Sequence, residues 1–252
     1  LPYVGYLMAR VYALVLAHRF DEAAEGCETA LRLLRSDHVT PVGEHDRVHA
    51  EGGAYSTRLW ADKIRGHVQD SVHTEALERF AVQHPTVLAE SWLWEARLFR
   101  AYRRGDLAAT RAAWETLTHK CAQAEVHFVL NKARVWLGLA CLDAGHIGEA
   151  QDLADQVIAE AEQRSNPLHR AMGLELRGLA LQEWEQPEQA AQCFEEGSRL
   201  LEAPEVGAID AYDSLLLRRA NLELTRGRLQ AARSLAERVE RRARAVDDVP
   251  GA

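Results

Sequence analysis

The sequence predicts an all-α protein in which about six antiparallel helix pairs stack into a solenoid. Three observations lead to this prediction. A short motif recurs about every forty residues, apolar residues recur at three- and four-residue steps, and strand-like alternation is absent. In addition, all seven prolines fall at expected helix ends or in loops, as the missing proline N–H requires.

The recurring motif is G-x-Φ-x-x-A, where Φ is apolar, and its clearest copy is GHIGEA at 145–150. Degraded copies start 39 to 48 residues apart: HRFDEA at 18–23, GHVQDS at 66–71, GDLAAT at 105–110, EQPEQA at 185–190 and GRLQAA at 227–232. A repeat of this length is typical of folds in which one supersecondary unit buries its apolar face against the next.

Each copy lies between two helical stretches, so each repeat is expected to be one helix pair. The first helices are expected at 3–17, 46–65, 87–104, 125–144, 168–184 and 206–226. Their partners are expected at 21–36, 68–83, 106–121, 147–163, 187–202 and 229–246. The whole chain, 1–252, is then one domain with repeats at 1–37, 46–84, 85–122, 124–164, 166–203 and 205–247, and the loop 38–45 accounts for the longest interval.

Small residues within the stretch LGLACLDAGHIGEA (137–150) have separate expected roles. Gly145 is expected to end a helix in the left-handed conformation, which is least costly without a Cβ. Gly138 and Ala150 are expected to let two helix axes approach closely. A large side chain at Gly138 should therefore cost about 1–3 kcal/mol through overpacking.

Charge is unevenly distributed along the chain. The formal net charge of −8 argues against indiscriminate nucleic-acid binding, yet residues 215–246 hold nine Arg and three Glu. This basic end could contact an acidic partner, a neighbouring domain or DNA. The alternative is a solvated last helix supported by ion pairs such as Glu237–Arg241.

The cysteines and the apolar start of the chain bear on the cellular compartment and on membrane insertion. Four cysteines lie far apart without a CxxC pair, at positions 27, 121, 141 and 193, so reduced, mostly buried thiols in a cytoplasmic protein are expected. The apolar stretch 1–17 carries Arg10, lacks a basic flank and is short for a membrane span. We interpret it as a buried helix. Because the chain begins with Leu rather than Met, we expect a piece of a longer protein.

Catalytic and metal-binding patterns are weak or absent in the sequence. There is no GxxxxGK[ST], GxGxxG, GxSxG or HExxH, so we expect no enzyme activity and no cofactor. The segment GEHDRVHAE offers His45, Asp46, His49 and Glu51, with the histidines four residues apart. Metal sites use such spacing but also need further ligands and supporting contacts. We interpret the segment as a solvated helix start.

The stretch 137–150 also carries a family resemblance. Its pattern, L-G-x-x-(large)-x-x-x-G-x-x-x-x-A, resembles the tetratricopeptide repeat, and RGLALQEWEQPEQAAQCF at 177–194 adds Phe194 four residues after Ala190. The early repeats depart from the pattern, since Val11, Leu59 and Leu98 occupy the small-residue position and the usual closing proline is absent. The long, divergent repeats are similar to the superhelical region of MalT-like, large ATP-binding LuxR-type transcription regulators. They also resemble the peptide-sensing repeat domains of Gram-positive quorum regulators.

The tetratricopeptide resemblance implies a right-handed superhelix whose first helices line a concave binding face. Carried over by position, that face would hold one equivalent row in successive repeats: Tyr12, Trp60, Phe99, Leu139 and Leu179. The third repeat would add Trp92, Glu95, Tyr102 and Arg103. Such aromatic and charged residues are good anchors for a partner. The alternative is that many of them belong to the core between repeats.

The expected function is a non-catalytic interaction module, the sensing or oligomerisation segment of a larger bacterial LuxR-type transcription or signalling regulator. Its partner would be a protein or peptide, with a small-molecule effector and oligomerisation left open. In the LuxR-type family a DNA-binding domain follows this region, so no direct nucleic-acid binding is expected here, and no membrane binding either. A stand-alone scaffold for peptide segments and an accessory domain of a larger enzyme are the alternatives.

Overall fold

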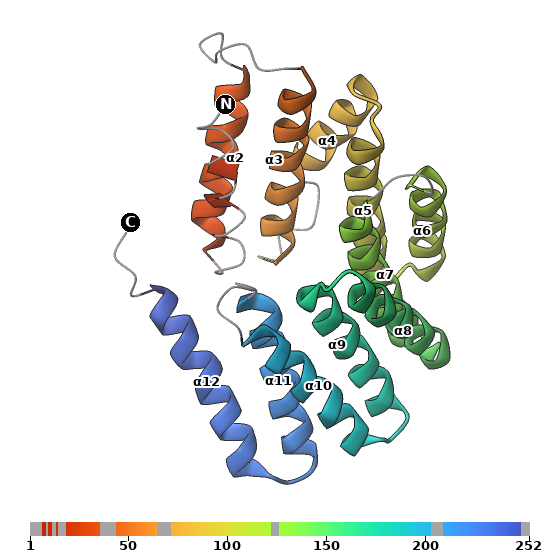
Figure 1. Cartoon of the computed structure of the whole chain (residues 1–252), viewed down its shortest axis with the longest axis vertical. Helices are drawn as coiled ribbons and strands as arrows, with labels where there is room; N and C mark the ends of the chain where they lie inside the picture. Colours follow the sequence, from red (N-terminus) through yellow and green to blue (C-terminus); the bar gives the residue numbers. More distant parts are fainter. Residues whose placement is uncertain are drawn as a thin grey trace. The chain divides into compact units, whose positions relative to one another are not determined.

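The computed structural model describes residues 7–8, 10–11, 14, 19–35, 44–64, 72–121, 126–202 and 209–247. Every regular element in these residues is an α-helix (Figure 1). The helices are α2 (Phe20–Arg35), α3 (Glu44–Ile64), α4 (Val72–Gln83), α5 (Val87–Arg103), α6 (Leu107–Cys121), α7 (His127–Asp143), α8 (Ile147–Gln163), α9 (Pro167–Glu183), α10 (Pro187–Leu201), α11 (Ile209–Thr225) and α12 (Leu229–Asp247).

These bounds confirm the all-α fold and the expected helix pairs, most of them to within a few residues. The helix expected at 3–17 lies largely outside the described residues, but 7–8, 10–11 and 14 are helical. The helix starts also follow local chemistry. Asn166 caps α9 by accepting a hydrogen bond from the His169 N–H at 3.0 Å, and Pro167 and Pro187 occupy the first turns of α9 and α10.

The chain divides into two compact units, Leu1–Ala133 and Arg134–Ala252, with the division inside α7. In the first unit α2 to α6 pack in chain order and α3 also contacts α5. In the second unit α8 to α12 pack in chain order and α9 also contacts α11. Within these two groups the helices therefore pack on their sequence neighbours, and α3–α5 and α9–α11 bring first helices of successive repeats together, as in a solenoid. The description as one domain of six repeats stays a prediction.

Close approach of helices depends on glycines at the small-residue position of the repeat. A Cβ built at Gly138 would lie 2.3 Å from Cδ2 of Leu176 on α9. A Cβ at Gly178 would lie 2.3 Å from Cε1 of Phe194 on α10. Ala150, the other small residue of the stretch, is fully buried. Gly138 thus allows α7 to approach α9 closely, while the expected close approach of α7 and α8 at Gly138 and Ala150 stays a prediction.

The connections α5–α6, α7–α8, α9–α10 and α11–α12 are three-residue turns with one recurring geometry. After α7, the Gly145 N–H donates to the Leu142 carbonyl at 2.9 Å and the His146 N–H to the Cys141 carbonyl at 2.8 Å. This pattern is the Schellman motif, which places its glycine at positive φ, here +79°. The turn after α9 repeats both hydrogen bonds but places Glu185 at φ +57°.

None of the helices in the described ranges has the length and apolar content needed to cross a membrane.

Replacing Glu185 by glycine should stabilise the protein. A side chain in the left-handed region is strained, and Glu185 is exposed, so its removal costs no packing. We expect Glu185→Gly to raise the free energy of unfolding by about 0.5–1 kcal/mol, the strain relief being partly offset by the greater freedom of glycine in the unfolded chain. Urea unfolding checks this. The reverse change, Gly145→Glu, should lower the same free energy, and a loss of stability in Glu185→Gly would contradict the argument.

A single methyl group at Gly178 should destabilise the second unit. Because Phe194 is fully buried, its ring has little room to move away from the added Cβ. Gly178→Ala should lower the free energy of unfolding by about 1–3 kcal/mol, measured by urea unfolding. The matched control is Gly148→Ala on α8, where a Cβ would meet nothing within 4 Å. If both variants unfold at the same denaturant concentration, close approach at Gly178 does not limit the packing.

Candidate functional site

Five of the seven predicted site residues lie on α5. Of the other two, Tyr12 lies outside the described residues, and Trp60 lies on α3 with a side chain that is not described. Leu139 and Leu179, which belong to the same predicted row as Tyr12, Trp60 and Phe99, are both partly buried. Leu179 packs against the hydrophobic core formed by α9 to α12. Whether any of these residues contacts a partner stays a prediction.

Trp92 is half-buried because it packs against α3. Its ring fills the notch left by Gly52, where a Cβ would lie 2.2 Å from Trp92 Cζ3. The His49 ring meets it edge-on, with centroids 5.9 Å apart and planes at 71°. Trp92 therefore helps to join the first helices of two successive repeats.

Glu95 is buried, with 3% of its surface exposed, and forms an ion pair with another buried residue. Its carboxylate oxygen Oε1 lies 3.5 Å from Nζ of Lys132, which is 8% exposed. The ammonium group of Lys132 also lies 5.4 Å from the centre of the Phe128 ring. Glu95 and Lys132 thus connect α5 to α7 beneath the surface.

Phe99 is buried as well, with 5% of its surface exposed, which favours the core interpretation for this residue. Tyr102 is half-buried and meets Phe99 edge-on, with ring centroids 6.1 Å apart. The Phe99 ring is therefore used in packing, and its contact with a partner stays a prediction.

Arg103 is the predicted residue that is clearly exposed, and two further arginines accompany it. Arg100 lies one turn earlier on α5, and Arg104 is the C-cap. Within the part of the chain that the structure describes, the guanidinium groups of these three arginines have no acidic or hydrogen-bonding partner. Residues three and four apart lie on the same helix face. The end of α5 thus presents a concentrated, uncompensated positive charge.

The second unit contains a polar contact equivalent to the buried Glu95–Lys132 ion pair, but a more exposed one. Glu175 on α9 accepts hydrogen bonds from Ser214 Oγ at 2.7 Å and from Arg218 Nε at 3.2 Å, both on α11. Glu95 and Glu175 each lie three residues before the small-residue position of their repeat. Lys132 and Ser214 each lie six residues before it. The same two positions therefore join successive first helices in both units.

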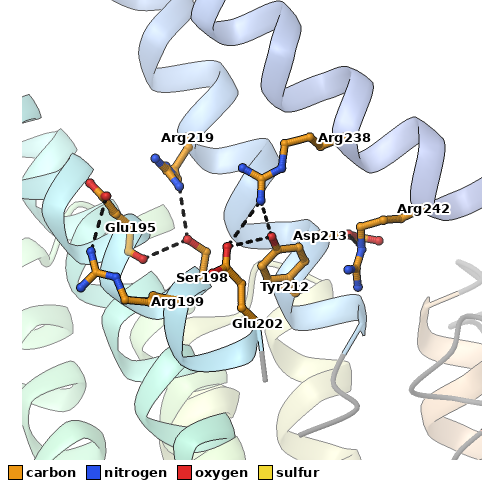
Figure 2. Close-up of polar contacts among 9 residues, drawn as sticks. All are labelled: Glu195, Ser198, Arg199, Glu202, Tyr212, Asp213, Arg219, Arg238 and Arg242. Carbon is orange, nitrogen blue, oxygen red and sulfur yellow. Dashed lines mark hydrogen bonds and ion pairs between the residues drawn. The ribbon is translucent and has the colours of Figure 1, made fainter. Parts of the chain in front are cut away.

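The basic end of the chain is largely used to hold α12 in place (Figure 2). Arg238 donates to the Tyr212 hydroxyl at 2.5 Å, and this hydroxyl donates to Glu202 Oε1 at 3.2 Å. Burial raises the pKa of Tyr212, although Arg238 acts in the opposite direction. The phenol therefore stays protonated at neutral pH and can donate to the carboxylate.

Two further arginines extend this network. Arg242 lies 3.0 Å from Asp213 Oδ1 and 4.4 Å from the centre of the Tyr212 ring, and Figure 2 shows Arg219 reaching Ser198. The expected pair Glu237–Arg241 is not formed, because Glu237 pairs with Arg233 at 2.8 Å on the preceding turn.

Among the side chains that the structure describes, no three His, Cys, Asp or Glu residues come together as metal ligands. His45 and Asp46 have undescribed side chains. The four cysteines, all in described parts of the chain, are not joined by disulfides, and burial raises the pKa values of the Cys121 and Cys193 thiols. These two thiols are therefore protonated and poorly nucleophilic at neutral pH.

No protein-family model and no curated protein matches the sequence. Solved structures do show a similar fold. BtubC (BKLC) from P. vanneervenii is 10% identical with a TM-score of 0.62, and the match covers 92% of this chain and 94% of that one. A Rap protein complexed with Competence and Sporulation Factor is 12% identical with a TM-score of 0.56, covering 98% of this chain and 79% of that one. The chain is thus a helical repeat protein. Its relation to MalT-like regulators stays a prediction.

Sequence reasoning missed the links between first helices. Lys132 lies 37 residues after Glu95, and nothing local marks them as partners. Comparing equivalent positions of successive repeats could have found the link, since an acid at one position faces a donor at the other. Arg100 and Arg104 were visible in the string RLFRAYRR, but the absence of acidic partners is a property of the folded chain.

Removing one member of the buried pair should cost more than removing both. Lys132→Met leaves the Glu95 carboxylate buried without its cation, which should lower the free energy of unfolding by about 3 kcal/mol. Adding Glu95→Leu should restore most of this loss, because no charge is then buried. Urea unfolding of the four proteins gives the coupling energy. A double variant no more stable than Lys132→Met would show that the pair is not coupled.

Proposed function

We propose that this chain is a non-catalytic interaction module that binds an acidic segment of a protein or peptide partner at the end of α5. The observation that carries the proposal is the group formed by Arg100, Arg103 and Arg104, called the α5 arginine cluster below. Arg103 and Arg104 are exposed, and the three side chains have no acidic partner among the described residues.

Electrostatics within the helix favours such a partner. Like charges three and four residues apart destabilise a helix, while the helix dipole at the C-terminus stabilises cations there. The dipole therefore holds the cluster in place without neutralising it. A carboxylate-rich segment would supply the missing anions, and guanidinium groups bind carboxylates through two parallel hydrogen bonds. The neighbouring Tyr102, half-buried against Phe99, adds a rigid apolar surface at the edge of the cluster.

The fold also supports an interaction role. The Rap protein of similar fold was crystallised with Competence and Sporulation Factor, so helical repeats of this kind can hold a factor. By analogy, we propose that the present chain senses or docks a partner for a larger bacterial regulator of the LuxR type. The stand-alone scaffold and the accessory domain of an enzyme are the competing proposals.

The sequence on either side of Leu1 and Ala252 separates these proposals. A nucleotide-binding motif upstream and a helix-turn-helix downstream would support the regulator. A gene that encodes only these repeats would support the scaffold, and a catalytic domain in the same gene would support the accessory role.

Binding of an acidic peptide tests the α5 arginine cluster directly. The probe is a fluorescein-labelled hexaglutamate peptide, followed by fluorescence anisotropy, with hexalysine as the charge-reversed control. We expect hexaglutamate to bind at low salt and more weakly as ionic strength rises. Arg100→Ala/Arg103→Ala should raise its Kd by roughly tenfold, with unchanged helicity because neither side chain is buried.

The matched control is Arg241→Ala, since Arg241 is also exposed and without a partner in the described residues but lies on α12. It should bind hexaglutamate like the parent protein. Equal weakening by Arg241→Ala would show an effect of net charge alone and would contradict a site on α5. So would unchanged binding by the double variant.

A further inference from the structure

The turn between α9 and α10 departs from the other turns of the same geometry. After α5, α7 and α11 the residue at positive φ is a glycine, at φ +70°, +79° and +71°. The residue just before that glycine is Arg104, Ala144 or Arg226. In the α9–α10 turn the same two positions hold Trp184 and Glu185. This turn therefore carries two residues that its backbone geometry does not require.

Trp184 presents a large aromatic side chain at the end of α9. It is the C-cap of the helix, and 42% of its surface is exposed. Among the residues that the structure describes, its indole ring has no aromatic, cationic or hydrogen-bonding partner. The face of a tryptophan ring is negative and attracts cations more strongly than the ring of tyrosine or phenylalanine. Trp184 thus offers an accessible surface that suits a cation.

Two carboxylates flank the ring. Glu183 and Glu185 are both exposed, and neither carboxylate has a cationic or hydrogen-bonding partner within the described ranges. Glu183 lies in the last turn of α9, where the negative end of the helix dipole disfavours an acid. Glu185 is in the left-handed region, which disfavours any side chain. Both acids therefore destabilise the turn in the free protein, and a bound cation would compensate their charge.

The base that reaches this turn from the next repeat is already engaged. Arg226 lies with its Nη2 at 2.5 Å from Oε1 of Glu188, in the first turn of α10. Its Nη1 lies 3.1 Å from Oε1 of Glu223 on α11. Both terminal nitrogens of Arg226 therefore have carboxylate partners, and the charges of Glu183 and Glu185 are left without a cation in the described part of the chain.

We infer that this acidic turn, formed by Glu183, Trp184 and Glu185, binds a lysine or arginine side chain in a basic segment of a partner protein. The cation lies on the indole ring, and the carboxylates accept its hydrogen bonds. This site goes beyond the proposed function, because it selects the opposite charge from the α5 arginine cluster and lies in the other unit.

The carboxylates favour a basic segment over an apolar one. An apolar segment on Trp184 would remove Glu183 and Glu185 from water without giving them hydrogen bonds, which is costly. A basic side chain can instead pack its alkyl stem on the ring while its charged end meets the carboxylates. The strain at Glu185 agrees with this role, because residues in unfavourable backbone regions cluster at binding sites.

Binding of a basic peptide tests the inference. The probe is fluorescein-labelled hexaarginine, followed by fluorescence anisotropy at low salt. We expect it to bind the parent protein, and Trp184→Ala should raise its Kd by roughly threefold to fivefold. Trp184→Phe should retain part of the affinity, since its ring attracts a cation more weakly. Circular dichroism should show unchanged helicity in both variants, because Trp184 lies at the exposed end of α9.

Variants of the carboxylates separate binding from stability. Glu183→Gln/Glu185→Gln should raise the Kd for hexaarginine by roughly fivefold. Glu185→Gly should also raise it, by about twofold, although this variant relieves strain and is expected to unfold at a higher urea concentration than the parent protein. The matched control is Glu115→Gln/Asp152→Asn, which removes two exposed carboxylates that lie on α6 and α8 and have no partner in the described residues. It should bind hexaarginine like the parent protein.

Proton NMR of unlabelled hexaarginine locates the cation. The δ-methylene protons of arginine should shift upfield when the parent protein is added, because they then lie over an aromatic ring, and Trp184→Ala should abolish this shift. A parent protein that does not bind hexaarginine, a Trp184→Ala variant that binds it as tightly as the parent, or an equal loss of affinity in Glu115→Gln/Asp152→Asn would each overturn the inference.

Discussion

Close approach of helices at the small-residue position is the constraint on which the second unit depends. Gly138 and Gly178 each lie where a single methyl group would collide with a fully packed side chain, Leu176 and Phe194. The glycines therefore bring α9 close to α7 and to α10. A polar link joins α9 to α11, since Glu175 accepts hydrogen bonds from Ser214 and Arg218. Small-residue packing and polar links thus join different pairs of helices in this unit.

The first unit also packs its helices closely, but it carries larger residues at the small-residue position. Leu98 occupies the position of Gly138, and it is fully buried. In the first unit the close contact between helices is found instead at Gly52, where the Trp92 ring occupies the space that a side chain would need. The aromatic and charged residues of α5 therefore serve mainly to join helices. The arginines at the end of α5 are the exception, since their side chains have no partner among the described residues. The packing residues and the arginines of the proposed binding site therefore share the same helix.

The fold was predictable from the sequence because its signals are local and repeated. Gly145, the prolines and the apolar steps each act within a few residues, and six weak copies reinforce one another. The site was less predictable, because burial of Phe99 and the pairing of Glu95 with Lys132 depend on residues one repeat away. The basic end shows the same limit. Its arginines are conspicuous in sequence, but their partners Tyr212, Glu202 and Asp213 are set by how α12 packs.

The three-residue turns restrict how the chain can change in length. From α7 to α10 every connection is such a turn, with its middle residue, Gly145, Ser165 or Glu185, at positive φ. One inserted or deleted residue within a helix would rotate everything beyond it by about 100°. Buried positions would then face solvent. In this stretch evolution can substitute residues freely on the outer surfaces but can hardly add or remove one, so the spacing of forty residues is maintained by geometry rather than by any single side chain.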